Sequence, residues 1–271
     1  MLDFPQKDRY TLYDMVQMVS LLRSRDGCPW DREQTHESIR RNFLEEAYEA
    51  VEAIDQKDSA HLREELGDVL MQVLFHSDIE REAGSFDIED VADAAVRKLL
   101  ERHPHVFGEV KVSGSGEVLE NWDAIKRRQN NQLTHASAMD SVARSLPSLW
   151  RAEKIQNKAR KAGFDWPDIG GALDKIEEEL CELREAVKKG EGVDEEVGDL
   201  LFSVVNVSRF TGTDPEQALG AACDKFIKRF SIAEKLASER KLDMTEMTLD
   251  DLDKLWDESK RLINEETCSA F

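Results

Sequence analysis

The chain has 271 residues and is strongly acidic, because 57 Asp and Glu against 37 Lys and Arg give a formal net charge of −20. Proteins that bind duplex nucleic acid or anionic membranes do so through Lys and Arg, so this balance excludes nucleic acid polymers and membrane surfaces as partners. No apolar run is long enough to cross a bilayer, and the N-terminus lacks the pattern of a leader peptide. Its four cysteines are far apart in the sequence, as in reducing compartments. We therefore expect a soluble, cytoplasmic protein.

Apolar residues recur every three or four positions along most of the chain, which predicts an all-α fold. In chain order, a first clear stripe consists of Leu62, Leu66, Val69, Leu70 and Val73. Residues 104–120 and 129–141 are rich in polar and turn-forming residues, which predicts loop and linker. A second stripe, typical of an amphipathic helix and with Glu179 and Glu182 at its border, consists of Leu173, Ile176, Leu180, Leu183 and Val187. Gly190 and Gly192 then break the chain, and we expect Asp194 to cap the next helix.

The two halves of the chain carry the same motifs in the same order, which indicates a tandem duplication. Each half begins with Gly-x-x-Trp, as GCPWD at 27–31 and as GFDWP at 163–167. Two acidic helical motifs follow, LEEAYEAVEA and EELGDVLMQV in the first half, EEELCELREA and EEVGDLLFSV in the second. A basic segment and Trp-Asp-x-x-Lys then complete each half, as KLLERH and NWDAIK, then KFIKRF and LWDESK. We divide the chain into a first repeat over 1–128, a linker over 129–145 and a second repeat over 146–271.

Each repeat carries pairs of carboxylates at a spacing of three residues on two successive helices. At this spacing the Cβ atoms lie roughly 5–6 Å apart on one helix face, so antiparallel packing of the two helices would bring both pairs together. The pairs are Glu179 with Glu182 and Glu196 with Asp199 in the second repeat, and Glu46 with Glu49 and Glu65 with Asp68 in the first. Carboxylates at the border of a core repel each other and are costly to desolvate, so their convergence predicts a compensating cation.

Oxygen ligands without nearby Cys or His favour Mg²⁺, or alternatively Mn²⁺, over zinc. A metal held by an acidic protein suits a polyanionic substrate such as a nucleoside triphosphate, because it binds phosphate oxygens and lowers the pKa of bound water. We expect cationic side chains to complete the site, namely Lys175, Lys225, Lys228 and Arg229. Trp256 is a candidate to stack on a base. The alternative for the charged residues is a solvated helix face, and for the tryptophan it is packing.

The motifs together resemble the MazG family of nucleoside triphosphate pyrophosphohydrolases, in its long bacterial form with two tandem repeats. Beyond the acidic motifs, the resemblance is carried by GCPWD, ERHPHVF at 101–107, RSLPSLWRAEKIQ at 144–156, GFDW and KFIKRF. It implies helical bundles that are completed across a homodimer. It also implies Mg²⁺-dependent hydrolysis of NTPs and dNTPs to the monophosphate and pyrophosphate, with a cellular role in nucleotide-pool cleaning or stress response.

The resemblance also implies roles for individual residues, and it places the activity in the second repeat. Metal would be held at Glu179, Glu182, Glu196 and Asp199, and nucleotide contacts would fall on Lys175, on the stretch from Lys225 to Arg229, and on Trp256. Glu178 is a candidate to accept the proton of the attacking water, with a structural role as the alternative. The first repeat retains its carboxylates together with Lys98, Arg102 and Trp122, so loss of motif does not explain an inactive first half.

Two other classes of protein fit parts of the pattern. A ferritin-like di-iron bundle also places Glu pairs on facing helices, but it needs Glu-x-x-His. That spacing is noted only at Glu33 and His36, which precede the acidic helices. The second alternative is a helical dimer that binds a protein partner and keeps its acidic residues for structure. Measuring pyrophosphate release separates an enzyme from such a scaffold.

Overall fold

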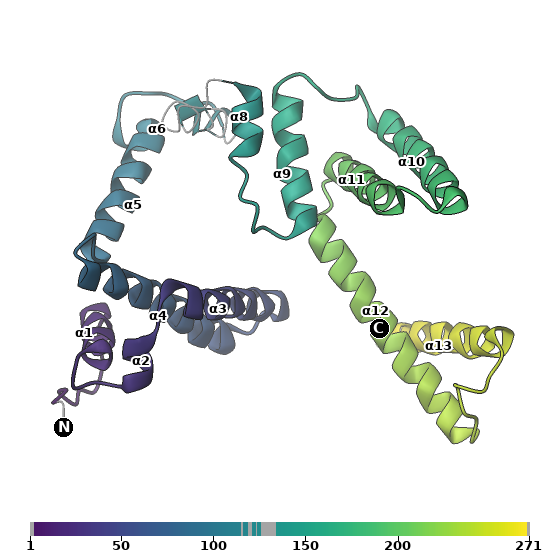
Figure 1. Cartoon of the computed structure of the whole chain (residues 1–271), viewed down its shortest axis with the longest axis horizontal. Helices are drawn as coiled ribbons and strands as arrows, with labels where there is room; N and C mark the ends of the chain where they lie inside the picture. Colours follow the sequence, from purple (N-terminus) through teal and green to yellow (C-terminus); the bar gives the residue numbers. More distant parts are fainter. Residues whose placement is uncertain (1–2, 115, 119–120, 123, 126–133, 270–271) are drawn as a thin grey trace. The chain divides into compact units, whose positions relative to one another are not determined.

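The computed structural model describes residues 3–114, 116–118, 121–122, 124–125 and 134–269, and within these ranges it contains helices and no strand (Figure 1). The predicted all-α fold is therefore confirmed. The chain divides into two compact units, residues 1–126 and 127–271. No helix in the described ranges combines the length and the apolar character that a bilayer span requires.

The first unit is built around two long helices that lie side by side. Its main helices are α1 (Leu12–Arg23), α2 (Pro29–Glu33), α3 (His36–Gln56), α4 (Ser59–Ala83), α5 (Ile88–Arg102) and α6 (Pro104–Phe107). α3 packs along α4, and α1 packs against α4 as well. The apolar core between these three helices is formed by Val19, Ile39, Leu74 and Phe75. α6 lies at the start of the segment 104–120, so the loop prediction was wrong for those four residues.

The second unit repeats this arrangement. Its helices are α8 (His135–Asp140), α9 (Ser148–Lys161), α10 (Ile169–Lys189), α11 (Val193–Thr211), α12 (Pro215–Glu239) and α13 (Leu249–Ser269). α10 packs along α11, α9 packs against α11, and α12 packs mainly against α13. The segment 129–141 was predicted to be loop and linker, but Thr134 caps α8 there with a reciprocal Thr134–Ser137 capping box. Residues 129–133 of that segment lie outside the described ranges.

Short connections set the geometry of both central helix pairs. Two residues, one of them Lys57 in the left-handed conformation, join α3 to α4, and three residues join α10 to α11. Such short connections require antiparallel neighbours. Gly192, with φ of 73°, is the residue before α11, and Asp194 lies inside its first turn. The prediction that Asp194 caps α11 was therefore wrong, although a carboxylate in the first turn still favours the helix through its dipole.

The predicted apolar stripe of α10 is only partly covered, because Ile176 and Leu183 are half-buried and its other three residues are exposed. The buried row of α10 consists of Ala172, Glu179 and Ala186, which recur every seven residues. The adjacent row, about 100° around the helix, is exposed and consists of Leu173, Leu180 and Val187. Small alanines therefore allow α10 and α11 to approach closely around a carboxylate, while the large apolar side chains lie outside this contact.

Candidate metal centre

A cluster of carboxylates lies between α10 and α11 in the second unit. One oxygen from each of Glu179, Glu196 and Asp199 lies within 4.8 Å of the other two. Glu179 extends from the buried row of α10, whereas Glu196 and Asp199 come from the N-terminal half of α11, one helical turn apart. The antiparallel pairing thus brings together residues that the sequence separates by 20 positions. Three of the four carboxylates whose convergence the spacing predicts therefore lie close together, and Glu182 lies outside the group.

Glu179 is the most deeply buried member of the cluster, with 5% of its surface exposed. Its Oε1 atom lies 2.8 Å from Nζ of Lys175, one turn earlier on α10. Its Oε2 atom is buried and has no hydrogen-bond partner among the described residues. A buried carboxylate oxygen without a partner is costly unless a cation or a donor binds it. The donor set therefore fits a hard divalent cation such as Mg²⁺.

The pKa of Glu196 also indicates that the cluster has too little positive charge to balance its carboxylates. Burial raises the pKa of Glu196 above its ordinary value, and the neighbouring charges of Glu182, Glu179 and Asp199 raise this pKa further. Glu182 therefore acts on the cluster electrostatically, although it is exposed and lies outside the group of three close oxygens. Two like charges at short range oppose ionisation unless a cation offsets them.

Lys175 links the two adjacent glutamates of the EExxE motif. Its ammonium group lies 2.8 Å from Oε1 of Glu178 as well as from Glu179, and these hydrogen bonds, first that to Glu178, raise the pKa of Lys175. Glu178 is mostly exposed. The structure thus places Glu178 next to the cluster through Lys175, and not as a member of it.

The first unit contains a matching cluster between α3 and α4. Oxygen atoms of Glu46, Glu49 and Glu65 lie within 4.8 Å of one another. Burial raises the pKa of Glu46, and the charges of Asp68, Glu49 and Glu65 add to this effect. Glu65 is 7% exposed, and its Oε2 atom lacks a hydrogen-bond partner among the described residues, as Oε2 of Glu179 does.

The two clusters differ in their cations. In the first unit, Nε2 of His61 lies 3.0 Å from Oε1 of Glu65, at helical i,i+4 spacing. The sequence analysis did not predict this pair. Aligning the acidic motifs places Asn42 where the second repeat has Lys175, and aligning the basic segments places Glu101 where it has Lys228. The first cluster therefore lacks two of the cations that the second repeat carries.

The predicted nucleotide contacts on α12 and α13 lie apart from the cluster within one chain. Lys225 and Lys228 are exposed on α12. Within the described part of the chain, the ion pairs of the cluster are formed by Lys175 and not by Lys225, Lys228 or Arg229. The Nε atom of Arg229 is buried without a hydrogen-bond partner among the described residues. Trp256 on α13 packs against Phe226, with ring centroids 5.0 Å apart. Their role in binding a nucleotide stays a prediction.

Paired antiparallel helices with a buried carboxylate cluster in each of two units define a duplicated all-α protein with two candidate metal centres. The family model of the MazG nucleotide pyrophosphohydrolase domain matches this chain twice, over residues 34–107 and 171–254. Each match contains one complete acidic cluster. The chain belongs to this family.

Relatives from several bacteria match nearly the whole chain. A Thermotoga maritima protein named nucleoside triphosphate pyrophosphohydrolase/pyrophosphatase MazG is 45% identical over 247 residues, which is 91% of this chain and 94% of that protein. The Escherichia coli K12 nucleoside triphosphate pyrophosphohydrolase is 43% identical over 248 residues, covering 90% and 94%. The Bacillus subtilis protein YabN, described as uncharacterized, is 46% identical over 94% of this chain and 54% of its own length.

Proposed function

We propose that the protein is a nucleoside triphosphate pyrophosphohydrolase that requires Mg²⁺, with Mn²⁺ as an alternative, and converts NTPs and dNTPs to the monophosphate and pyrophosphate. The observation that carries the proposal is the buried, unpartnered Oε2 atom of Glu179 inside a cluster of carboxylates. The names of the Thermotoga and Escherichia relatives support the substrate class and the bond that is cleaved.

Four carboxylates of the second unit would hold the metal: Glu179, Glu182, Glu196 and Asp199. When bound, Mg²⁺ supplies charge neutralisation for the phosphates and acidifies a coordinated water. In the reaction, a water oxygen bonds to the α-phosphorus, the bond from that phosphorus to the bridging oxygen of the β-phosphate breaks, and pyrophosphate leaves. Glu178 is the candidate to accept the proton of the water, because it lies on the same turn as Glu179 and is held by Lys175.

Lys175 has a defined positioning role in this proposal. Its ammonium group bridges Glu178 and Glu179 at 2.8 Å each, so it fixes both carboxylates and adds positive charge at the edge of the cluster. A triphosphate that approaches an acidic protein gains from such a charge. Further substrate contacts are proposed on α12 and α13. The phosphates would contact Lys225, Lys228 and Arg229, and the base would contact Trp256.

The proposed enzyme is a homodimer, which is supported by apolar surface on the central helices. Leu180 is 37% exposed and Val187 is 60% exposed, in one row along α10. α11 adds an exposed apolar row consisting of Val197, Leu201 and Val204. Exposed apolar rows of this kind are typical of a protein interface, and burying them against a second copy would complete a four-helix bundle. A second copy could also supply the cations of α12 to the cluster.

We assign the activity to the second unit because of its cations. Lys175 and Lys228 have Asn42 and Glu101 as their counterparts in the first unit, so the second site is the better match for a triphosphate. The first cluster, Glu46, Glu49, Glu65 and Asp68, is proposed as a second metal site of lower or no activity. A cytoplasmic location and a role in nucleotide-pool cleaning or stress response complete the proposal.

The test is a product analysis of the full-length protein with ATP and dATP in the presence of Mg²⁺ or of a chelator. We expect equal amounts of monophosphate and pyrophosphate, and no turnover with the chelator. Glu179→Gln should lower turnover at least about 100-fold, because even partners of metal ligands contribute 10–100-fold. Glu177→Gln, an exposed change on the same helix, is the control. Release of ADP and orthophosphate, or full activity of Glu179→Gln, would contradict the proposal.

A further inference from the structure

We propose that the first unit binds a transition metal ion such as Zn²⁺ between the imidazoles of His36 and His76. His36 is the first residue of α3, and His76 lies 40 positions further along the chain, in the second half of α4. His76 follows the cluster residue Asp68 by eight residues, or about 12 Å along α4. The site is therefore separate from the carboxylate cluster of this unit, and it does not depend on the proposed hydrolysis of nucleotides.

The two imidazoles face each other through the same ring atom. Nδ1 of His36 lies 2.7 Å from Nδ1 of His76. The ring planes differ by 7°, and the ring centroids lie 5.0 Å apart. Because the centroid distance exceeds the nitrogen distance by about the two ring radii, the rings are nearly coplanar and both nitrogens lie on the line between the ring centres. The two Nδ1 atoms thus point directly at each other, as in a linear hydrogen bond.

One proton lies between these two nitrogens, because two lone pairs at this distance would repel each other. A neutral imidazole has one N–H donor and one acceptor nitrogen. Nε2 of His36 lies 2.8 Å from Oε1 of Glu80, so a neutral His36 donates its Nε2–H to that carboxylate and accepts at Nδ1. His76 then donates its Nδ1–H to His36. A metal ion takes the place of this proton when the proton of His76 moves to Nε2 of the same ring, which leaves both Nδ1 atoms as ligands.

Glu80 gives His36 the surroundings of a metal ligand. Histidines that bind metals almost always donate their second ring N–H to a carboxylate, a carbonyl or water, which fixes the tautomer and makes the ligand nitrogen more basic. Imidazole nitrogens suit Zn²⁺, Cu²⁺ and Ni²⁺, whereas Mg²⁺ prefers oxygen ligands such as those of the carboxylate clusters. Two nitrogens bound to a tetrahedral Zn²⁺ lie about 3.3 Å apart, so the facing rings need to separate by only about 0.6 Å.

The surroundings of the pair hold one ring in place and leave the other accessible. Phe43 of α3 packs at right angles to the ring of His76, with the ring centroids 5.7 Å apart. Burial lowers the pKa of His76, and the charge of His36 lowers it further, which favours the neutral form that a metal binds. The side chain of His36 is 39% exposed and that of Glu80 is 25% exposed. An ion can therefore reach the pair from solvent, and water would complete its coordination.

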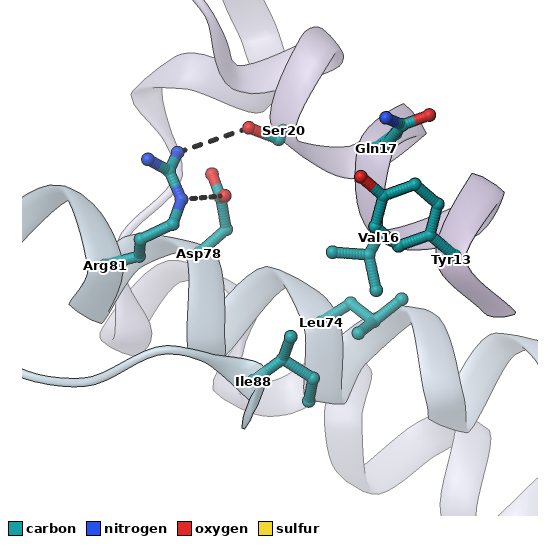
Figure 2. A pocket seen from close by; sticks show the side chains of 8 residues that line it. All are labelled: Tyr13, Val16, Gln17, Ser20, Leu74, Asp78, Arg81 and Ile88. Carbon is teal, nitrogen blue, oxygen red and sulfur yellow. Dashed lines mark hydrogen bonds and ion pairs between the residues drawn. The ribbon is translucent and has the colours of Figure 1, made fainter. Parts of the chain in front are cut away.

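The other charged residues in this part of α4 engage each other on the side that faces α1. Figure 2 shows Arg81 bonded to Asp78 beside a hollow of about 260 Å³ between α1 and α4. Asp78 also accepts a hydrogen bond from Arg23 of α1 at 3.2 Å. The imidazole pair lies instead between α3 and α4. Asp78 is thus engaged by two guanidinium groups, and Glu80 is the carboxylate that serves the pair.

The second unit shows that the paired helices do not require these polar side chains. Aligning the acidic motifs places Ile169, Val207 and Thr211 at the positions of His36, His76 and Glu80. Ile169 is the first residue of α10, as His36 is the first residue of α3. The same fold thus has apolar residues in place of both imidazoles. Polar groups at such a contact are costly unless they are satisfied, and the pair in the first unit is satisfied by one shared proton or by a metal ion.

The test measures Zn²⁺ binding by the full-length protein with calorimetry, in an excess of Mg²⁺ that competes for the carboxylate clusters. The wild type should show one Zn²⁺ site that the double variant His36→Gln with His76→Gln lacks. Glu80→Gln keeps both ligand nitrogens but removes the carboxylate, so it should weaken Zn²⁺ binding about tenfold or more. His135→Gln, which removes an exposed histidine at the start of α8, is the matched control and should bind Zn²⁺ as the wild type does.

A spectroscopic measurement identifies the ligands in the wild type itself, whatever the folding of the variants. Cu²⁺ bound in an excess of Mg²⁺ should show electron paramagnetic resonance couplings to two imidazole nitrogens. The first carboxylate cluster would supply oxygens and the single nearby imidazole of His61, and hence no pair of nitrogens. Equal Zn²⁺ binding by the wild type and the double variant, or a Cu²⁺ signal without the pair of nitrogen couplings, would overturn the inference.

Discussion

Glu179 is a buried carboxylate in the contact between two helices, where most proteins place an apolar side chain. Its flanking positions, Ala172 and Ala186, are small, so the helices approach closely and little water reaches the carboxylate. Lys175 satisfies one of its oxygens, and the other remains without a partner among the described residues. The position thus lowers the stability of the metal-free protein and favours metal binding.

Glu196→Gln tests this balance between stability and metal binding through pH. The pKa of Glu196 is raised in the folded protein, mainly by burial, so its ionisation opposes folding, and the folded state loses stability as the pH rises through that pKa. Without metal, we expect Glu196→Gln to melt at a higher temperature than the wild type at about pH 8. The difference should vanish below the ordinary value of 4.5, where both side chains are neutral.

Thermal melts with a chelator and with Mg²⁺ provide the check. The Mg²⁺-induced rise in melting temperature should be smaller for Glu196→Gln than for the wild type, since one charged ligand is missing. A variant that melts below the wild type both at about pH 8 and below pH 4.5, or that keeps the full Mg²⁺-induced rise in melting temperature, would contradict this prediction. It would show that ionised Glu196 neither opposes folding nor binds the metal.

At the scale of elements, periodicity predicts the helices and the pairing of their acidic motifs, but not which face of α10 is covered. Glu179 and Leu180 are neighbours in the sequence, and only the packing decides which of them is buried. The sequence pattern reports the total apolar surface, including the part that a second copy could cover, so it does not separate the half-buried Ile176 and Leu183 from the exposed Leu180.

Leu180→Glu tests the exposed row of α10 as a dimer interface. In a symmetric dimer each change occurs twice, so the loss of two buried leucine side chains should weaken association by roughly 3 kcal/mol or more. Light scattering coupled to gel filtration should show a dimer for the wild type and a monomer for the variant. Lys189→Glu, which changes charge at the exposed end of the same helix, should remain dimeric. A monomeric wild type, or a dimeric Leu180→Glu, would contradict this interface.

At the scale of the whole molecule, duplication has produced two related units that carry different charged residues near their carboxylate clusters. Both keep a carboxylate cluster with a buried oxygen, on Glu65 and on Glu179, that has no partner in the described part of the chain. The second unit adds Lys175 and Lys228, whereas the first has Asn42 and Glu101 at the matching positions. Under the proposed function, such divergence separates a unit that binds metal from one that also binds a triphosphate.

The most direct test of this assignment compares paired changes in the two clusters of the full-length protein. Pyrophosphate release from ATP with Mg²⁺ would be measured for Glu46→Gln with Glu65→Gln, and for Glu179→Gln with Glu196→Gln. We expect the second pair to lose activity by more than about 100-fold and the first pair to keep it within about threefold. Loss of activity in the first pair, with the second pair still active, would contradict the assignment of the reaction to the second unit.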